Sequence, residues 1–305
     1  MPETQYLLPY RGRFAPSPTG PLHAGSVLTA LASYLDARAR NGVWLVRIED
    51  LDPPRESKQA AADILSTLEA LELTWDETVV YQSQRSPAYE EALAQLDSQQ
   101  LVYACRCSRQ KLTAQGSVYP GWCRALQIPR ARDTALRCCV TDSTVAFSDR
   151  LQGPYTQHLR QDVGDFVIRR RDGLFAYQLA VVIDDAWQGI TDIVRGIDLI
   201  DSTPRQIYLQ QMLGFAVPAY AHVPVVTNTQ GQKLGKQQFA EAVDPARPGP
   251  VLFKTLQRLQ QNPEPGLATA TPTAILAWAI AHWQPANLNG IKQIPEIEDS
   301  AAAAV

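Results

Sequence analysis

RFAPSPTGPLHAGS, residues 13–26, is the stretch of this chain that indicates its fold. A short extended run ends in a Pro-rich turn, and an amphipathic pattern follows it. The apolar positions of that pattern are Val27, Leu28, Leu31 and Leu35. This order predicts a strand, a tight turn and a helix N-terminus, where backbone N–H groups and the helix dipole favour phosphate. Gly20 and Gly25 allow a ligand to approach that backbone closely.

The elements that follow predict a parallel sheet. We expect the first helix to run from Ser26 to Arg40, with Ser26 as its N-cap and a glycine, Gly42, closing it. Val43–Ile48 is predicted to be a buried strand with Glu49 at its carboxyl end, where open α/β sheets bind ligands. A second amphipathic helix has apolar positions at Ala61, Ile64, Leu65, Leu68 and Leu71. The alternation indicates an α/β, doubly wound, Rossmann-like fold.

The pattern changes after residue 100. Residues 101–165 are rich in Cys, Pro, Gly and Arg, which predicts an insert that splits the parallel fold. Strands are expected again at FVIRR (166–170) and LFAYQLAVVID (174–184), with Asp172-Gly173 as the hairpin turn between them.

The remaining chain continues the α/β pattern and then becomes helical. A helix is predicted from Thr203, as N-cap, to Gly214, and a strand over His222–Thr227 leads to the motif KLGKQ (233–237). These elements divide the chain into five expected parts. They are the first half of the catalytic domain (1–100), a basic insert (101–165), the second half of the catalytic domain (166–240), a helical C-terminal part (241–295) and a disordered tail (296–305).

Length and composition are those of an ordinary globular protein. A chain of 305 residues with 45% hydrophobic residues can build one large or two small domains. The apolar run Ala274–Trp283 is shorter than the ~20 residues that span a bilayer. No secretory leader is recognisable, and five cysteines are an odd number for a disulfide framework. We therefore expect a cytoplasmic enzyme that does not bind membranes.

Positive charge is concentrated in one segment. Residues 101–137 contain seven Lys or Arg and one acid, Asp133, which gives this segment a charge of +6. Because the whole chain carries −3, the remainder carries −9. A basic module on an acidic body indicates a surface for a phosphate backbone, the alternative being a basic face exposed only to solvent.

Five sequence blocks together resemble one family. RFAPSPTGPLHAG, VRIEDLDPPR (46–55), YQSQR (81–85), ITDIVRGIDLIDSTPRQIYLQQMLG (190–214) and KLGKQ occur in the order seen in class I glutamyl- and glutaminyl-tRNA synthetases. HAG is similar to their HIGH element and KLGKQ to their KMSKS loop. Within the family, the chain most resembles the truncated glutamyl-Q tRNA(Asp) synthetases. The shared features are HAGS, IEDLDPPRE and a chain after KLGKQ that is too short for an anticodon-binding region.

The resemblance implies that ATP, accompanied by Mg²⁺, activates glutamate as glutamyl-adenylate and releases pyrophosphate. This step needs charge neutralisation on the phosphoryl oxygens. The implied ATP-binding residues are Thr19, Gly20, His23, Gly25, Lys233 and Lys236. His23 and Lys236 are the implied catalytic pair, the alternatives being a turn histidine and a solvated loop lysine. Gly235 stands where the family usually has Ser, which removes a hydroxyl donor.

Glutamate requires guanidinium groups for its carboxylates and a carboxylate for its ammonium. The resemblance implies Arg13 and Arg195 for the carboxylates, Glu49 for the ammonium, Tyr177 and Ser17 through their hydroxyls and Ala15 through its backbone. Two alternatives stay open at this point. Glu49 could be a surface acid at a strand end, and Arg195 could form a structural ion pair with Asp198.

A cysteine cluster lies within the basic insert. Cys105, Cys107 and Cys123 offer three thiolates, which favour zinc in a tetrahedral site, although three cysteines could also be small apolar residues. The family resemblance implies Tyr119 as the fourth ligand. We expect one structural Zn²⁺ that stabilises an insert poor in apolar residues. The adjacent pair Cys138-Cys139 is interpreted as incidental to this site.

The favoured function is an enzyme that activates glutamate independently of tRNA and transfers it to RNA. The resemblance implies that the acceptor is the queuosine base at the wobble position of tRNA(Asp). The alternatives are charging of a tRNA 3′ end, transfer of glutamate to a protein or small molecule, and a binding paralogue without catalysis. We expect the enzyme to act as a monomer.

Overall fold

The computed structural model describes residues 9–113, 116, 118–228, 230–234 and 242–296. Its strands are β1 (Arg11–Phe14), β2 (Val43–Ile48), β3 (Val80–Tyr81), β4 (Val102–Cys105), β5 (Ala135–Cys138), β6 (Thr144–Asp149), β7 (Gly153–His158), β8 (Phe166–Arg169), β9 (Asp192–Gly196), β10 (Ala219–Val223), β11 (Val225–Thr227) and β12 (Gln293–Pro295). Its α-helices are α1 (Ala24–Arg38), α2 (Lys58–Ala70), α3 (Ser86–Ser98), α4 (Arg109–Thr113), α5 (Leu159–Asp162), α6 (Tyr177–Trp187), α7 (Thr203–Leu213), α8 (Pro248–Arg258) and α9 (Pro272–Ala281).

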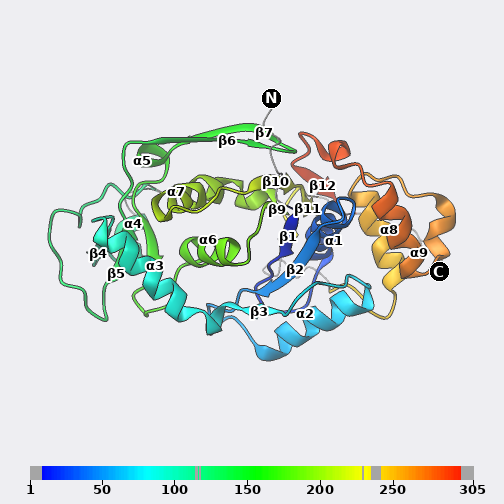
Figure 1. Ribbon diagram of the computed structural model, residues 1–305, viewed down its shortest axis with the longest axis horizontal. Coiled ribbons are helices and arrows are strands. Elements are labelled where there is room, and N and C mark those ends of the chain that lie inside the picture. Colours follow the sequence, from blue (N-terminus) through cyan, green and yellow to red (C-terminus); the bar gives the residue numbers. More distant parts are fainter. Residues whose placement is uncertain (1–8, 114–115, 117, 229, 235–241, 297–305) are drawn as a thin grey trace, which may run out of the picture.

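A parallel sheet occupies the centre of the molecule (Figure 1). β1 pairs with β2 and β2 with β3, all in parallel, and β9 pairs in parallel with β10. The two parts meet at β1 and β9, where the backbone N–H of Thr191 donates to the carbonyl of Arg11 at 3.0 Å. The predicted parallel α/β core is therefore present.

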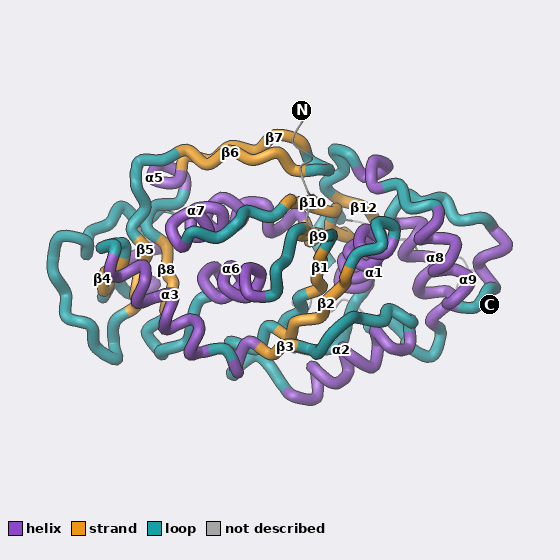
Figure 2. The backbone as a smooth tube through the Cα atoms, in the orientation of Figure 1, coloured by secondary structure: helices purple, strands orange, loops and turns teal. Residues whose placement is uncertain are grey.

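Two apolar cores lie on opposite faces of this sheet (Figure 2). Trp44, Val46 and Ile48 of β2 pack with α1, α2, α8 and α9, whereas Leu45 packs with α3, α6 and α7. Strands covered on both faces are apolar along their whole length. This is why Val43–Ile48 shows no alternation of polar and apolar residues.

The insert forms a second, antiparallel unit at the left of Figure 1. β5 pairs with β4 on one side and with β8 on the other, and β6 and β7 form a hairpin. β8 begins at Phe166, just after the predicted end of the insert at residue 165. It nevertheless belongs to the antiparallel sheet of the insert, because it pairs with β5. The β6–β7 hairpin extends back to the central sheet, where the N–H of Arg150 donates to the carbonyl of Tyr220 at 2.9 Å.

The first helix begins two residues earlier than predicted. Its N-cap is His23, not Ser26, and the ring of His23 accepts the backbone N–H of Ser26. The helix ends at Arg38, and the N–H of Gly42 donates to the carbonyl of Ala37 at 2.9 Å. The ring nitrogen of His23 therefore caps the helix in place of the predicted Ser26 hydroxyl, because the preceding turn directs the ring toward the first helical turn.

The second arm of the predicted hairpin is wrong. After β8 only an isolated bridge between Arg169 and Phe175 remains, and residues Tyr177–Trp187 form helix α6. This segment is buried throughout Leu179–Ile183, because it packs against α3 and α7. A run whose only polar positions are Gln178 and Asp184 has no clear helical or strand periodicity, so packing decides its structure.

Two further boundaries differ from prediction. The strand predicted over His222–Thr227 is divided at Pro224, which has no N–H to donate. β10 pairs with β9, whereas β11 pairs with β12 near the C-terminus. Helix α7 begins at Thr203 with Ser202 as its N-cap, and Gly214 ends it in the left-handed conformation with φ 74° as predicted.

The C-terminal helices α8 and α9 pack against α1, on its side away from the central strands (Figure 1). α9 covers most of the apolar run Ala274–Trp283 and buries Ile275, Leu276 and Ala279. None of the helices in the described part of the chain is long and apolar enough to cross a membrane. Most of the predicted disordered tail, residues 297–305, lies outside the described residues.

Candidate active site

A cavity of about 560 Å³ opens at the carboxyl ends of β1, β2 and β9. The predicted site residues that line it are Arg13, Ala15, Ser17, His23, Gly25, Glu49, Tyr177, Arg195 and Lys233. Thr19 and Gly20 are not among its lining residues, and Lys236 and Gly235 lie outside the described residues. Segments separated by more than two hundred positions in the sequence thus contribute to one cavity.

His23 lies at one end of this cavity, on the N-terminus of α1. Its Nδ1 accepts the N–H of Ser26 at 3.3 Å, and its Nε2 lies 3.1 Å from the Ser26 hydroxyl. A Cβ at Gly25 would lie 3.2 Å from a ring carbon of His23, which is a tight contact. Glycine at this position therefore leaves space for the imidazole ring. The positive end of a 15-residue helix dipole and this imidazole therefore face the same cavity.

Lys233 lies on the other side of the cavity. Its ammonium is 2.6 Å from a carboxylate oxygen of Asp198, and both residues line the cavity. Asp198 makes no ion pair with Arg195 in the described part of the chain. The alternative that Arg195 is held by Asp198 is therefore not what the structure shows.

A buried charge cluster forms the floor beneath Arg13 and Glu49. Arg13 donates through Nε and Nη2 to Asp185, at 3.0 and 3.2 Å. Arg47 donates to Asp185 at 2.7 Å and to Glu49 at 3.1 Å, and it is fully buried. Two guanidinium groups thus face two carboxylates. Glu49 is 7% exposed, so it is not a surface acid at a strand end.

The electrostatics of this cluster follow from burial. Burial raises the pKa of Glu49 above its ordinary value, against the opposing effect of Arg47 and Arg13. Burial also acts to raise the pKa of Asp185, but the neighbouring Arg13 and Arg47 outweigh it and lower that pKa overall. Asp185 is therefore held ionised between the two arginines, which fixes the orientation of Arg13.

Arg195 is held by neutral groups. Its Nε donates to Nε2 of His222 at 3.1 Å, Nη1 to the amide oxygen of Gln206 at 2.8 Å and Nη2 to the hydroxyl of Thr203 at 2.7 Å. The hydroxyl of Tyr177 lies 3.4 Å from Nη1. A guanidinium oriented without a carboxylate partner keeps its full positive charge for an anionic ligand.

Behind Arg195 lies a buried histidine that was not predicted as a site residue. His222 Nδ1 is 2.5 Å from a carboxylate oxygen of Asp149, which comes from the β6–β7 hairpin of the insert. Asp149 fixes the proton on Nδ1, so that Nε2 accepts from Arg195. Burial lowers the pKa of His222 below its ordinary value of 6.5, which keeps the ring neutral at neutral pH.

Acidification is expected to weaken glutamate binding through this histidine. A protonated ring can no longer accept from Arg195 and repels it, so the KM for glutamate should rise several-fold as the pH falls below the ordinary histidine value of 6.5. The unfolded chain takes up this proton near 6.5 and the folded chain only at lower pH, so the free energy of unfolding also falls as pH falls. The KM for ATP over the same range is the internal control.

His222→Gln provides the decisive comparison. The terminal amide of glutamine reaches the position of Nε2, so it can still accept from Arg195 through its oxygen but does not titrate, and the acid-side rise in the glutamate KM should flatten. An unchanged pH profile in this variant would show that another group causes the effect.

Arg47, Asp185, Asp149 and His222 contribute to the site but were not predicted as site residues, and their signals in the sequence were weak. Arg47 is a charged residue inside an apolar strand, and Asp185 lies in an apolar run. A charge within a buried run is a sign of a paired group, but it does not name the partner. Asp149 and His222 carry no signal of this kind.

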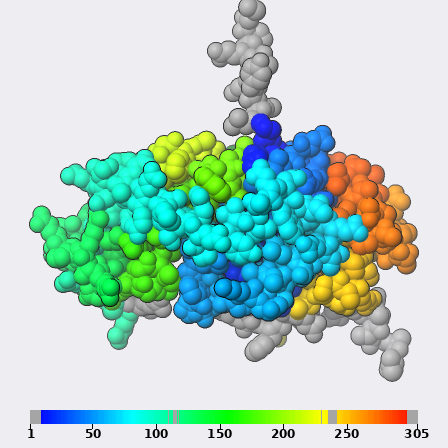
Figure 3. Space-filling model, turned by 60° about the horizontal axis from the view of Figure 1, so that its bottom comes forward, coloured from blue at the N-terminus to red at the C-terminus, as the bar shows by residue number. Residues whose placement is uncertain are grey.

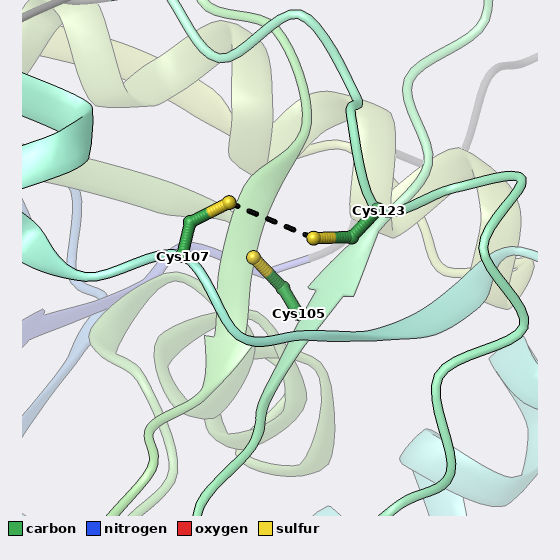
Figure 4. Close-up of side chains that lie close together, drawn as sticks. All are labelled: Cys105, Cys107 and Cys123. Atoms are coloured by element: carbon green, nitrogen blue, oxygen red, sulfur yellow. Dashed lines mark hydrogen bonds between the residues drawn. The ribbon is translucent and has the colours of Figure 1, made fainter.

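Three cysteine sulfurs point toward one another in the insert (Figure 4). The sulfurs of Cys105, Cys107 and Cys123 all lie within 4.8 Å of one another, and those of Cys107 and Cys123 are 3.6 Å apart. The Tyr119 hydroxyl lies 3.4 Å from the sulfur of Cys105 and 3.7 Å from that of Cys107. Ligands of a tetrahedral zinc ion are separated by roughly 3.5–3.8 Å, so this donor set fits zinc.

The backbone beside Tyr119 is tightly packed. Tyr119 forms a bridge with Gly164, and a Cβ at Gly164 would lie 2.0 Å from the carbonyl oxygen of Tyr119. Gly164 also has φ 69°, a conformation that favours glycine. This contact positions the hydroxyl of Tyr119 against the three sulfurs.

Comparisons with known proteins matched a family model over most of this chain. The family model for the catalytic domain of class I tRNA synthetases (E and Q) matches residues 10–119 and 127–247. A glutamyl-Q tRNA(Asp) synthetase of Pseudomonas putida (strain W619) is 51% identical, over 95% of this chain and 98% of its own. A second, of Pseudomonas fluorescens, is 52% identical over 95% of this chain and 97% of its own.

Solved structures share the fold at lower identity. A glutamate-tRNA synthetase from Elizabethkingia anophelis superposes with a TM-score of 0.77 at 22% identity, over 94% of this chain and 68% of that one. A glutamate tRNA ligase from Elizabethkingia meningosepticum, solved in complex with its amino acid, gives 0.76 at 22% identity. This likeness concerns the arrangement of the chain alone.

Proposed function

Because this chain belongs to the class I glutamyl- and glutaminyl-tRNA synthetase family, and within it to the glutamyl-Q tRNA(Asp) synthetases, we propose that it activates L-glutamate with ATP and transfers it to the queuosine base of tRNA(Asp). One observation carries this proposal. A single cavity brings together two oriented guanidinium groups, a buried carboxylate and a helix N-terminus. Glutamate and a nucleoside triphosphate require those charges.

In the activation step, an oxygen of the glutamate α-carboxylate attacks the α-phosphorus of ATP. The bond from that phosphorus to the bridging oxygen of the β-phosphate breaks, and pyrophosphate leaves with the bonding electrons. His23 and the N-terminus of α1 stabilise charge on the phosphoryl oxygens, and Mg²⁺ accompanies the triphosphate. Lys233, and Lys236 outside the described residues, are the proposed partners of the leaving pyrophosphate.

Arg13 and Arg195 are the proposed partners of the two glutamate carboxylates, and Glu49 that of the ammonium. The hydrogen bonds of these groups support the assignment. Asp185 orients Arg13, and Arg47 orients Glu49. His222 orients Arg195. Tyr177 and Ser17 add hydroxyls, and Ala15 a backbone group, on the cavity wall. Each of these side chains acts by binding and orientation rather than by covalent chemistry.

The insert is the proposed unit for holding the RNA, with one structural Zn²⁺ bound by Cys105, Cys107, Tyr119 and Cys123. The metal would supply only a fixed tetrahedral junction, since four protein ligands leave no open position for catalysis. A site complete within one chain is consistent with a monomer. ATP and tRNA are its substrates, so we expect it to act in the cytoplasm.

The test is transfer of radioactive glutamate to tRNA(Asp) with and without the modified base. We expect label only on the queuosine-containing RNA, and nuclease digestion should recover it on the modified nucleoside. Pyrophosphate exchange with glutamate and ATP alone should proceed without any RNA. Equal labelling of both RNA samples at the 3′ end would instead support ordinary tRNA charging, and absence of exchange would support a binding protein.

A further inference from the structure

A second groove lies outside the catalytic cavity, between α3 and the sheet of the insert. Its volume is about 970 Å³, larger than that of the cavity, and it is lined by α3, residues 130–136 and the turn at 169–173. In Figure 3 the cyan surface of α3 and the green surface of the insert adjoin one another at the left of the molecule.

Guanidinium groups dominate this groove. The cations that line it are Arg130, Arg132, Arg169, Arg170 and Arg171, and its three acids are Glu90, Asp97 and Asp172. The groove is therefore positive on a chain whose total charge is −3. A positive groove on an acidic body favours a polyanion over a neutral partner.

Two of these arginines have no carboxylate partner among the described residues. Arg130 pairs with Asp97 and Arg169 with Glu90, and Arg170 pairs with Asp172 at 2.6 Å. Arg171 donates to a backbone carbonyl, that of Arg106. Arg132 makes no hydrogen bond or ion pair in the described ranges, and both Arg132 and Arg171 are exposed.

The fold assembles this groove from two basic segments. Arg130 and Arg132 belong to the positive segment found in the sequence, whereas Arg169–Arg171 follow the predicted insert. The antiparallel pairing of β5 with β8 places Leu136 opposite Arg169 and so joins the two segments on one surface. The run of three arginines had no assigned role in the sequence.

The groove also reaches the entrance of the catalytic cavity. Arg170 lies 3.3 Å from Asp52, and Asp52 also pairs with Arg55, which lines the cavity. One short chain of ion pairs therefore joins the wall of the groove to the wall of the cavity. An extended polyanion bound along the groove would therefore continue toward the entrance of the cavity.

We propose that this groove binds the sugar–phosphate backbone of the RNA acceptor, with Arg132 and Arg171 as phosphate ligands. Guanidinium groups bind phosphate oxygens in pairs, and arginines already paired with carboxylates keep further N–H donors for the same strand. Contacts of this kind set the position of the RNA and read no sequence. The proposal rests on the proposed function, because it takes an RNA as the partner.

The experiment measures binding of tRNA(Asp), with and without queuosine, over a series of salt concentrations. In the double variant Arg132→Ala/Arg171→Ala, the slope of log K against log salt should fall by about 1–2, since each lost phosphate contact removes about 0.7–0.9. Affinity at about 0.1 M salt should fall roughly 10-fold or more, equally for both RNA samples. Pyrophosphate exchange without RNA should stay unchanged, because neither residue lines the catalytic cavity.

The matched control is Arg247→Ala/Lys292→Ala, which removes the same charge from exposed positions in the C-terminal part. Its salt slope should equal that of the unmodified protein. A groove variant with an unchanged slope, or a control with the same loss, would overturn the proposal. Failure of the proposed function is a separate result, since it would appear as label missing from the queuosine nucleoside while the salt slopes still differ.

Discussion

Replacing Arg13 with alanine is expected to reduce glutamate-dependent pyrophosphate exchange by roughly 100-fold or more, because truncation of a buried charged partner costs ~2–5 kcal/mol. Arg13 is 3% exposed and lines the cavity. The fold should survive, since Asp185 keeps Arg47 at 2.7 Å when Arg13 is lost. The measurement is exchange at saturating ATP with a glutamate titration.

The control for Arg13→Ala is Arg40→Ala. Arg40 is more exposed than Arg13, but it too pairs with a buried carboxylate, Asp36, which keeps Arg150 as a second partner, so each variant leaves its carboxylate with one other arginine. Arg40 does not line the catalytic cavity. The control should retain exchange, and both variants should unfold at temperatures close to that of the original protein. Ordinary exchange in Arg13→Ala would show that this guanidinium does not bind glutamate.

Loss of one cysteine ligand is expected to lower the zinc content of the protein well below one ion per chain. The protein purified without chelator should contain about one zinc per chain, and Cys107→Ser should contain far less, because three ligands hold a structural zinc ion poorly. The insert should then unfold at a lower temperature. RNA glutamylation should fall at least 10-fold, whereas exchange without RNA should change little, because the cluster lies outside the catalytic cavity.

Cys139→Ser serves as the control for the metal site. Cys139 is a half-buried cysteine of the same insert that is not part of the cluster. Its zinc content should equal that of the original protein. Substoichiometric zinc in the original protein itself, or full zinc in Cys107→Ser, would contradict the site.

Several parts of the catalytic cavity could be predicted from the sequence because local motifs carry them. The turn at residues 13–26 predicts the start of α1, and Glu49 follows directly from the end of a buried strand. Tyr177 and Arg195 came from the family resemblance rather than from geometry. The structure brings all of these into one cavity. Local chemistry was sufficient for the helix start and the strand end, and the family resemblance supplied Tyr177 and Arg195.

Other features depend on contacts that no local pattern contains. Residues 174–184 are apolar apart from Gln178 and Asp184, and packing against α3 and α7 decides that most of them are helical. The orientation of Arg195 depends on His222, whose tautomer depends on Asp149, 73 positions earlier in the sequence. No periodicity predicts a pair of that separation.

The amino-acid sequence by itself predicted the parallel core and the helix that begins beside the cavity, because these follow from neighbouring residues, and the family resemblance pointed to side chains that line the cavity. Tertiary structure alone decided which charges are paired. It placed Arg47 and Asp185 beneath the cavity, returned the hairpin of the insert to the central sheet and joined two arginine segments into one groove. The physical reason is that an ion pair forms between groups close in space, and separation along the chain does not fix that distance.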